Sequence, residues 1–285
     1  MTGKDVLAVV VSYDGLQQTV RGVEALRGQV GHVYIVDNGS QAPSLALLEA
    51  LEQDGYVTVA RLGENLGVGH ALNLGVRQAR DKGFGWLLTM DQDSVVDRGL
   101  LAAYEAAIRA DARQVCLAPT RIKQGEAPKN AAGREVRYAV TSGNLVAVGV
   151  FDEIGPYDEG FFIDCIDFDF CLRLRRAGHT IFRAAGALMQ HTLGDGVDVP
   201  EPVRKFYARH PPIRRYYMYR NYLYLMERYL LAFPGFILKL GLLHVVLLPL
   251  MAFHDTQPVA SYRAVGRGIL DYLRRRTGPA MERSL

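Results

Sequence analysis

Aspartates at three places in the sequence are candidates for catalysis or metal binding. These are Asp37, the pair Asp91 and Asp93, and the cluster Asp164, Asp167 and Asp169. Carboxylate oxygens are ligands that Mg²⁺ and Mn²⁺ prefer, and a substrate diphosphate can supply further oxygens. An Asp-x-Asp pair on extended backbone points both carboxylates to the same side. Asp91 and Asp93 are therefore a candidate metal site, although a solvated turn with Asp93 capping the next helix is the alternative.

The cluster around Asp167 lies at the start of an expected helix and suits proton transfer. A helix N-terminus favours negative charge, so capping accounts for one or two of the three aspartates. Phe161, Phe162 and Phe168 are their neighbours in sequence. Partial burial among such residues raises the pKa of a carboxylate, which suits a general base.

Three further features each allow two interpretations. Asp37-Asn38-Gly39-Ser40 is either an ordinary turn or a carboxylate placed to accept hydrogen bonds from a nucleobase or ribose. The loop Gly63–Gly69 either turns the chain or aims backbone N–H groups at a ligand. A lone histidine such as His191 is usually structural, but together with an Asp-x-Asp pair it is a candidate third metal ligand.

Short apolar runs alternate with helical stretches over the first 120 residues. We expect strands at 6–12, 33–37, 57–62, 86–90 and 115–118, and helices at 16–27, 43–53, 69–82 and 99–110. This alternation predicts an α/β fold with right-handed βαβ units and a parallel sheet. Ligands of such sheets bind beyond the carboxyl ends of the strands, where Asp37 and Asp91 fall. Further on we expect short strands over 121–150, a polar loop around Gln124–Gly133, a helix from about Ile166 and a strand at 187–190.

Several protein classes fit poorly. The first turn is Ser12-Tyr13-Asp14-Gly15, without the glycine spacing of a nicotinamide or flavin enzyme or the phosphate loop of a nucleotidyltransferase. Three scattered cysteines predict reduced thiols rather than a disulfide framework. Met1 to Asp5 does not resemble a signal peptide, so we expect a cytoplasmic protein.

Six motifs in order resemble glycosyltransferase family 2. They are Val-Ser-Tyr, Val-Asp-Asn-Gly-Ser, Asn-Leu-Gly-Val-Gly, Asp-Gln-Asp-Ser, Thr-Ser-Gly-Asn, and Phe-Phe-Ile-Asp-Cys-Ile-Asp-Phe-Asp-Phe-Cys-Leu-Arg. The likeness covers roughly residues 5–195, extends more loosely to Tyr217 and Arg220-Asn221, and is strongest to bacterial rhamnosyltransferases of O-antigen and related polysaccharide assembly. It implies a GT-A fold, which is Rossmann-like with a mostly parallel central sheet, followed here by a helical C-terminal extension.

The resemblance also implies roles for individual residues. Asp91 and Asp93 would bind Mn²⁺ or Mg²⁺, with His191 completing the coordination, and Asp167 would be the general base of an inverting transfer. Many relatives carry Glu-Asp where this chain has Ile166-Asp167, which leaves Asp164 and Asp169 as alternative bases. The expected substrate-binding residues are Ser12, Tyr13, Asp37, Asn65, Gly67, Asp91, Ser142, Gly143, Asn144 and Asp164.

The expected donor is dTDP-rhamnose, and the expected acceptor is a polysaccharide or lipid-linked glycan. UDP-linked galactofuranose, galactose or N-acetylglucosamine are alternative donors, and a non-catalytic nucleotide- or glycan-binding module is the rival class. We expect a catalytic domain over 1–200, with its nucleotide-binding part at about 1–120 and its acceptor part at about 121–200, and a basic, apolar helical region over 201–285.

Charge separates these two regions. Residues 1–200 hold 19 Lys and Arg against 25 Asp and Glu, a net of −6, whereas residues 201–285 hold 14 against 5, a net of +9. The apolar stretch from Tyr229 to Phe253 is interrupted by Pro234, Lys239, His244 and Pro249. We therefore expect two amphipathic helices lying on the cytoplasmic face of the inner membrane, with Arg214, Arg215 and Arg274–Arg276 near lipid headgroups. Covering the core or forming a homodimer are the alternatives. Nucleic acid is not an expected partner, because the acidic half would repel it.

Overall fold

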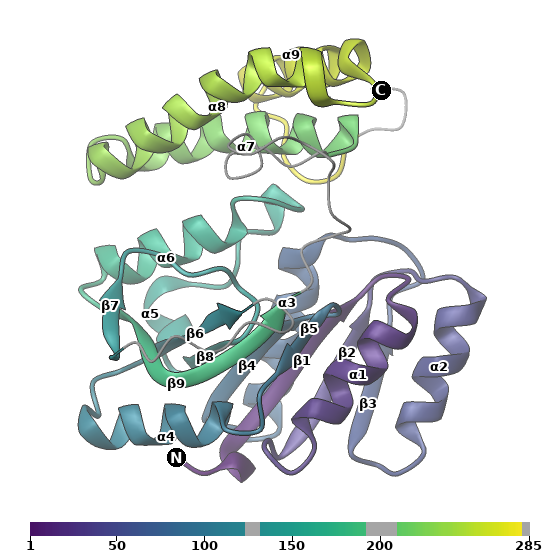
Figure 1. Cartoon of the computed structure of the whole chain (residues 1–285), viewed down its shortest axis with the longest axis vertical. Helices are drawn as coiled ribbons and strands as arrows, with labels where there is room; N and C mark the ends of the chain where they lie inside the picture. Colours follow the sequence, from purple (N-terminus) through teal and green to yellow (C-terminus); the bar gives the residue numbers. More distant parts are fainter. Residues whose placement is uncertain (123–131, 192–209, 281–285) are drawn as a thin grey trace. The chain divides into compact units, whose positions relative to one another are not determined.

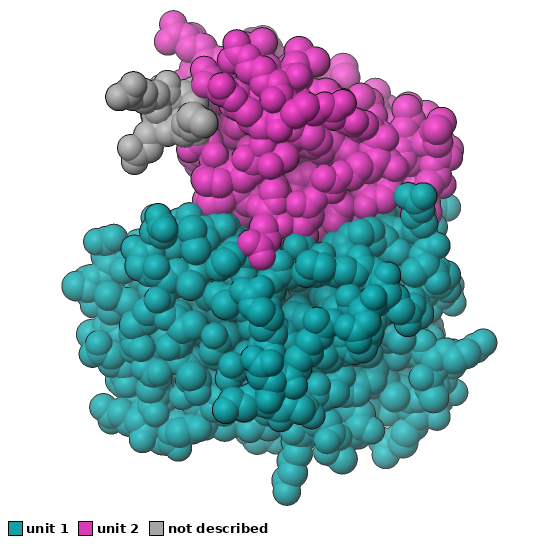
Figure 2. Space-filling view, turned by 180° about the vertical axis from the view of Figure 1, so that it is seen from behind, with its two compact units in different colours: residues 1–157, 170–192 teal, residues 158–169, 193–285 magenta. Residues whose placement is uncertain are grey.

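The computed structural model describes residues 1–122, 132–191 and 210–280. The chain divides into two compact units, which are coloured separately in Figure 2. Unit 1 comprises Met1–Tyr157 and Phe170–Thr192, and unit 2 comprises Asp158–Asp169 and Leu193–Leu285. The polar loop expected around Gln124–Gly133 falls almost wholly outside the described residues.

Unit 1 is built on four parallel strands joined by helices, as the alternation in the sequence predicts. The strands are β1 (Val6–Ser12), β2 (His32–Asp37), β3 (Val57–Arg61) and β4 (Trp86–Asp91), and they lie in the order β3-β2-β1-β4. The connecting helices are α1 (Leu16–Leu26), α2 (Ala42–Glu52) and α3 (Val68–Asp81). These elements begin and end within about two residues of the predicted positions, which confirms this part of the prediction.

Both faces of this sheet are covered by helices, which is why its strands are rich in buried apolar residues (Figure 1). All seven residues of β1 are buried. Val10 belongs to the core cluster that contains Val23 and Leu26 of α1. Val9 points to the other face, where a Cβ added at Gly75 of α3 would lie 2.6 Å from its side chain. The close approach of α3 therefore requires glycine at position 75.

The rest of the sheet is mixed in direction. Its strands are β5 (Ser94–Val96), β6 (Cys116–Ile122), β7 (Arg134–Val136), β8 (Asn144–Ala147) and β9 (Ile181–His191), and the order continues β4-β8-β6-β9-β5, with β7 also paired to β9. The parallel ladders are the longer ones in the sheet. The strand expected at 187–190 is the end of the longer β9, and β5 escaped prediction because three residues are too few to show alternation.

Further helices lie in unit 1 and at its boundary with unit 2. Helix α4 (Leu100–Ala110) packs against β9, and α5 (Val150–Ile154) follows β8. Two 3₁₀ turns, Gly3–Asp5 and Glu159–Phe161, precede β1 and α6 respectively. Helix α6 (Ile166–Arg176) begins at the predicted residue, and the boundary between the two units falls inside it.

Unit 2 contains the N-terminal turn of α6 and three long helices: α7 (Pro212–Tyr229), α8 (Pro234–His254) and α9 (Pro258–Leu273). The expectation that the apolar stretch would break is wrong, because α8 runs unbroken through Lys239, His244 and Pro249. The placement of Arg215 near headgroups is also wrong. Its side chain is 1% exposed and forms an ion pair of 2.8 Å with the equally buried Asp255.

Candidate active site

The carboxyl ends of three adjacent strands bring the first candidate residues together. Ser12 at the end of β1 is in register with Asp37 at the end of β2, and Val11 is in register with Asp91 at the end of β4. Parallel pairing thus aligns two carboxylates at one edge of the sheet, with β1 between them. Ser12 itself is buried, and its hydroxyl lies 3.4 Å from that of Thr19 in α1.

Asp37 is the buried acidic residue of this edge. It is 1% exposed, and its Oδ2 accepts a hydrogen bond of 3.2 Å from the backbone N–H of Ser40. Its Oδ1 is buried and has no hydrogen-bond partner among the described residues. A buried carboxylate oxygen without a donor is costly, roughly 1–3 kcal/mol or more, so a ligand that supplies a donor would bind favourably. Asp37 therefore has the properties of a recognition residue as well as of a turn.

The turn after β2 is tied to the turn before α3 by side-chain amides. Asn38 donates from Nδ2 to Asn65 Oδ1 at 2.9 Å and accepts at Oδ1 from the Leu66 N–H, also at 2.9 Å. Asn65 Oδ1 also accepts from the Gly67 N–H at 3.0 Å. These bonds occupy the Gly67 N–H, so this part of the loop turns the chain. Asn38 was not among the predicted site residues, because its partner Asn65 is distant in sequence.

The turn after β1 is held from both sides. The Tyr13 N–H donates to Gln92 Oε1 at 2.6 Å, the Asp14 N–H to Ser40 Oγ at 2.8 Å, and the Gln41 N–H to Asp14 Oδ1 at 2.7 Å. The Tyr13 ring remains about half exposed. Sequence reasoning missed Asp14 and Gln92, although Asp14 has φ of 51°, a conformation that aspartate tolerates better than most residues.

Asp91 and Asp93 flank the turn between β4 and β5. The premise of extended backbone is wrong, because Gln92 and Asp93 form a turn and the strand resumes at Ser94. Asp93 does not begin the next helix either; Asp97 accepts from the Gly99 N–H at 3.1 Å, just before α4. Both carboxylates are half-buried. Two carboxylates of this kind suit a hard divalent cation that also binds a diphosphate.

His191, the expected third ligand, ends β9. Its backbone is paired with Ser94, the residue after Asp93, whereas its side chain lies outside the described part of the chain. Over 1–122, 132–191 and 210–280, no described group of three His, Cys, Asp or Glu side chains forms a ready-made ion site. The register nevertheless brings the backbone of His191 beside the Asp91–Asp93 turn.

The segment Ser142–Asn144 lies beside the same turn. Ser142 Oγ accepts from the Asp91 N–H at 3.0 Å and donates to Ser94 Oγ at 2.8 Å. Gly143 has φ of +83°, its N–H donates to the Thr89 carbonyl at 2.7 Å, and a Cβ there would lie 2.6 Å from the ring of Pro119. Asn144 is 2% exposed, and its buried Oδ1 has no hydrogen-bond partner among the described residues. Asn144 is thus a second buried acceptor without a donor in unit 1.

The second acidic cluster lies in unit 2, where Asp164 and Asp169 form ion pairs with arginines of α7. Asp164 forms an ion pair of 3.0 Å with Arg214. Asp169, 1% exposed, accepts from Tyr229 Oη at 2.7 Å and pairs with Arg228 at 3.3 Å. Asp167 is half-buried, and its Oδ1 accepts from the adjacent Phe168 N–H at 2.9 Å.

The loop before α6 has an unusual backbone that α7 holds in place. Phe162, Asp164 and Cys165 have φ of 64°, 61° and 66°. Such conformations cost non-glycine residues on the order of 1–3 kcal/mol each. Asn221 donates from Nδ2 to the carbonyls of Phe161, Ile163 and Asp164, at 2.9, 2.7 and 3.1 Å. Arg220 adds bonds to the carbonyls of Gly160 and Phe161. Burial raises the pKa of Cys165 well above its usual range, so this thiol is no nucleophile.

The fold is that of a nucleotide-sugar-binding transferase, and comparisons with known proteins show the family. The family model for glycosyl transferase family 2 matches residues 7–167, and the chain belongs to this family. The protein is a glycosyltransferase with a GT-A fold, in which a mostly parallel central sheet is followed by the helices α7–α9.

Individual relatives give the next level of detail. The chain is 25% identical over 250 residues to the dTDP-rhamnosyl transferase RfbF of Shigella flexneri, covering 79% of this chain and 80% of that protein. It is 27% identical over 92 residues to a poly-beta-1,6-N-acetyl-D-glucosamine synthase of Staphylococcus aureus, covering 32% of this chain and 22% of the synthase.

Solved structures share the fold. GalNAc-T7 with UDP, GalNAc and Mn²⁺ superposes with a TM-score of 0.57 at 17% identity, covering 65% of this chain and 43% of that one. S. aureus TarS 1–349 in complex with UDP superposes with a TM-score of 0.52 at 17% identity, covering 79% and 66%.

Proposed function

We propose that this chain transfers L-rhamnose from dTDP-rhamnose, with inversion, to a polysaccharide or lipid-linked glycan. The observation that carries the proposal is the buried Asp37 carboxylate, whose Oδ1 has no partner among the described residues. The N3–H of thymine or uracil is a donor of the kind this oxygen lacks. The relative named as a dTDP-rhamnosyl transferase, similar over 79% of this chain, supports thymine and rhamnose. A UDP-sugar such as UDP-galactofuranose is the second candidate donor, because uracil offers the same N3–H and the structural neighbour TarS was solved with UDP.

In this proposal, Asp91 and Asp93 hold Mn²⁺ or Mg²⁺, together with His191. The hard oxygen donors of the two aspartates and the register of His191 beside their turn fit such an ion. A bound divalent cation would stabilise the negative charge that develops on the departing diphosphate. Ser142 fixes the backbone of Asp91 through its hydroxyl, and Asn144 offers a buried acceptor for a sugar hydroxyl.

Asp167 is the proposed general base. Its neighbours Asp164 and Asp169 tie this loop to α7 through Arg214, Arg228 and Tyr229, which is a structural role, and Asp169 is too deeply buried to contact an acceptor hydroxyl. Asp167 would take the proton of the acceptor hydroxyl while that oxygen attacks the anomeric carbon. The bond from this carbon to the diphosphate oxygen breaks at the same time, and the nucleoside diphosphate leaves from the opposite face. A positioned base contributes ~10²–10⁴ in rate.

A donor screen tests the proposal. Purified protein would be given Mn²⁺ or Mg²⁺ and a panel of nucleotide sugars, with release of nucleoside diphosphate as the signal and EDTA as the control. We expect metal-dependent release from dTDP-rhamnose. Release from a UDP-sugar alone would favour the second donor. Nucleotide binding without any release, even with glycan acceptors added, would favour a non-catalytic binding module.

The base is tested by three matched variants. Asp167→Asn should lose at least about 100-fold in kcat while keeping its affinity for nucleoside diphosphate, because only proton transfer is removed. Asp164→Asn and Asp169→Asn should instead lower thermal stability, because each removes a carboxylate paired with arginine. Full turnover in Asp167→Asn would refute the assignment.

The remaining expectations complete the proposal. Residues 1–120 bind the nucleotide and 121–200 the acceptor, Tyr13 contributes its half-exposed ring to the donor site, and the helical region brings the enzyme to the cytoplasmic face of a membrane. A homodimer formed through that helical region is the alternative to membrane attachment.

A further inference from the structure

The exposed face of α8 is apolar along its whole length. Its exposed side chains recur every three or four residues and include Leu238, Leu242, Val245, Val246, Pro249 and Phe253. Leu242 is 65% and Phe253 79% exposed. Lys239 is the one charged residue of this 21-residue helix. A continuous apolar stripe facing solvent marks a surface that something else covers.

The opposite face of α8 is packed inside unit 2. Ile237, His244, Leu247 and Met251 are buried, and Leu247 and Met251 cluster with Tyr219 of α7 and Val265 of α9. By length and composition alone α8 could cross a membrane. However, a crossing helix packed in this way would carry α7 and α9, with their arginines, into the hydrocarbon. The packing therefore favours a helix that lies in the membrane interface rather than across it.

Between residues 230 and 280, negatively and positively charged side chains differ in their exposure to solvent. The two carboxylates between residues 230 and 280 are Asp255 and Asp271, and both are buried beside arginines. In contrast, Lys239, Arg263 and Arg274 are exposed and form no ion pair among the described residues. The charged groups that α8 and α9 present to solvent are thus cationic, which complements an anionic surface.

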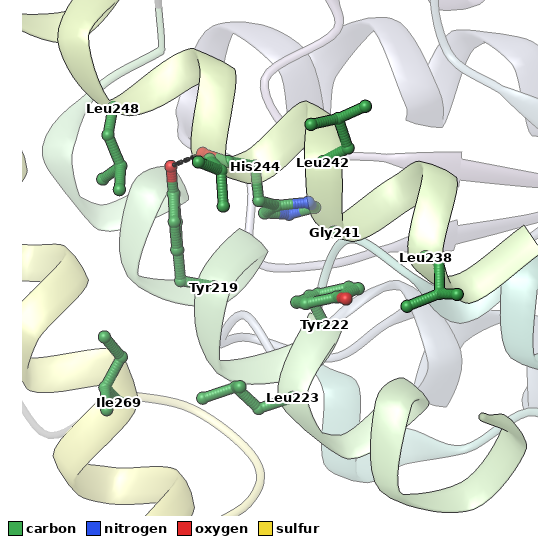
Figure 3. Close-up of a pocket in the computed structure, with 10 residues that line it drawn as sticks. Tyr219, Tyr222, Leu223, Leu238, Gly241, Leu242, His244, Leu248 and Ile269 are labelled. Carbon is green, nitrogen blue, oxygen red and sulfur yellow. Dashed lines mark hydrogen bonds between the residues drawn. The ribbon is translucent and has the colours of Figure 1, made fainter. Parts of the chain in front are cut away.

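A groove opens on the same side of α8. It has a volume of about 330 Å³ and is lined by Tyr219, Tyr222 and Leu223 of α7, by Leu238, Gly241, Leu242, His244, Val245 and Leu248 of α8, and by Ile269 of α9 (Figure 3). Its polar side chains have partners within unit 2: Tyr222 Oη donates to the Ile237 carbonyl at 3.2 Å, and His244 Nδ1 lies 2.8 Å from the Leu240 carbonyl. Tyr219 Oη donates to the His244 carbonyl at 2.7 Å, and the His244 ring stacks on Tyr222 with centroids 4.6 Å apart. The groove therefore suits an aliphatic chain rather than a polar ligand.

We propose that α8 and α9 form an anionic-membrane docking surface. In this arrangement α8 lies parallel to the bilayer, its apolar stripe enters the interface, and an acyl chain of a bilayer lipid occupies the groove. Lys239, Arg263 and Arg274 contact phosphate headgroups. A second copy of the chain fits less well, because it would bring these three cations against each other. The surface deepens the membrane attachment proposed above and is independent of the sugar that the enzyme transfers.

Vesicle co-sedimentation tests the surface with the full-length protein. Vesicles of phosphatidylcholine alone would be compared with vesicles in which about one lipid in three is the anionic phosphatidylglycerol. We expect binding to the anionic vesicles that weakens with salt. Leu242→Gln with Val246→Gln should lower the partition coefficient by roughly 100-fold, about tenfold for each exposed apolar side chain that no longer inserts.

Charge is tested separately. Lys239→Glu, Arg263→Glu and Arg274→Glu together should abolish the preference for anionic vesicles, a loss of about 100-fold or more. The matched control is Lys82→Glu with Arg109→Glu, two exposed cations of unit 1, which should bind vesicles like the parent protein. Circular dichroism should be unchanged in all variants, because every substituted side chain is exposed.

Each contrary result has a definite meaning. Equal binding to both kinds of vesicle would overturn the role of the three cations. No vesicle binding, together with a dimer in light scattering that Leu242→Gln and Val246→Gln convert to a monomer, would overturn the membrane surface in favour of a second copy. Release of nucleoside diphosphate in solution, measured on the same samples, should not change in any variant. This separates failure of the surface from failure of the proposed enzymatic function.

Discussion

Replacing Asp37 by Asn tests donor recognition most directly. The substitution keeps the size of the side chain and an oxygen that can accept from the Ser40 N–H. It removes the negative charge and exchanges one acceptor for an amide donor. A thymine or uracil N3–H would then lose a charge-assisted hydrogen bond, or face another donor.

The magnitude follows from the burial of the carboxylate. A hydrogen bond to a charged group contributes about 1.5–3 kcal/mol net, which corresponds to a rise of about 10- to 150-fold in Kd. Folding stability should change by less than about 1 kcal/mol, because Asp37 Oδ1, the proposed acceptor for the base, has no hydrogen-bond partner among the described residues. The variant should therefore fold normally and bind nucleotide weakly.

The change in affinity is measured by calorimetry in the presence of Mn²⁺, once with dTDP and once with inorganic pyrophosphate. Pyrophosphate lacks the base, so its affinity should be unchanged. Asp81→Asn, at the exposed end of α3, is the matched control. Unchanged dTDP binding by Asp37→Asn would refute base recognition, and an equal loss for pyrophosphate would mean that Asp37 acts through the metal or the fold.

Three shorter predictions concern stability and are measured by urea unfolding. Burial lowers the pKa of His244 below its usual 6.5, so the folded state binds fewer protons than the unfolded state. The free energy of unfolding therefore falls as the pH drops below about 6.5, by at most about 1.4 kcal/mol per pH unit. His244→Phe should reduce this dependence on pH. Asn221→Ala should cost about 1–3 kcal/mol, because the carbonyls of Ile163 and Asp164 lose the Asn221 donor, whereas that of Phe161 keeps Arg220; an unchanged midpoint would contradict the strained-loop argument. Gly143→Ala should cost at least about 1–2 kcal/mol because of its positive φ, whereas Gly83→Ala, also at positive φ but with open space around it, provides the steric control.

Local patterns were sufficient to predict the parallel half of unit 1. The strands there are rich in apolar residues and are separated by helical stretches, so the positions of Asp37 and Asp91 at one sheet edge follow from the chain order of strands and helices. Short elements such as β5 carry too few residues to show a period.

Contacts between distant residues could not be predicted in the same way. Hydrogen bonds join Asn38 to Asn65 and Tyr13 to Gln92, and each connects two separate loops. The type of a residue in one loop does not tell which residue of another loop it will contact. Arg215 shows the same limit, since an arginine in a basic segment is expected at the surface. The ion pair with Asp255, 40 residues away, compensates its buried charge, and the local sequence does not reveal that partner.

The identity of the catalytic carboxylate depends on such distant contacts. Asp164, Asp167 and Asp169 are equivalent in sequence, as aspartates among aromatic residues at the start of one helix. In the structure, α7 supplies Arg214 to Asp164, and Arg228 with Tyr229 to Asp169. Asp169 is also 1% exposed, so an acceptor hydroxyl does not reach it, whereas a general base must lie within hydrogen-bonding distance of the proton that it takes. If Asp169→Asn rather than Asp167→Asn abolished turnover while the fold persisted, this link between partner and role would be wrong.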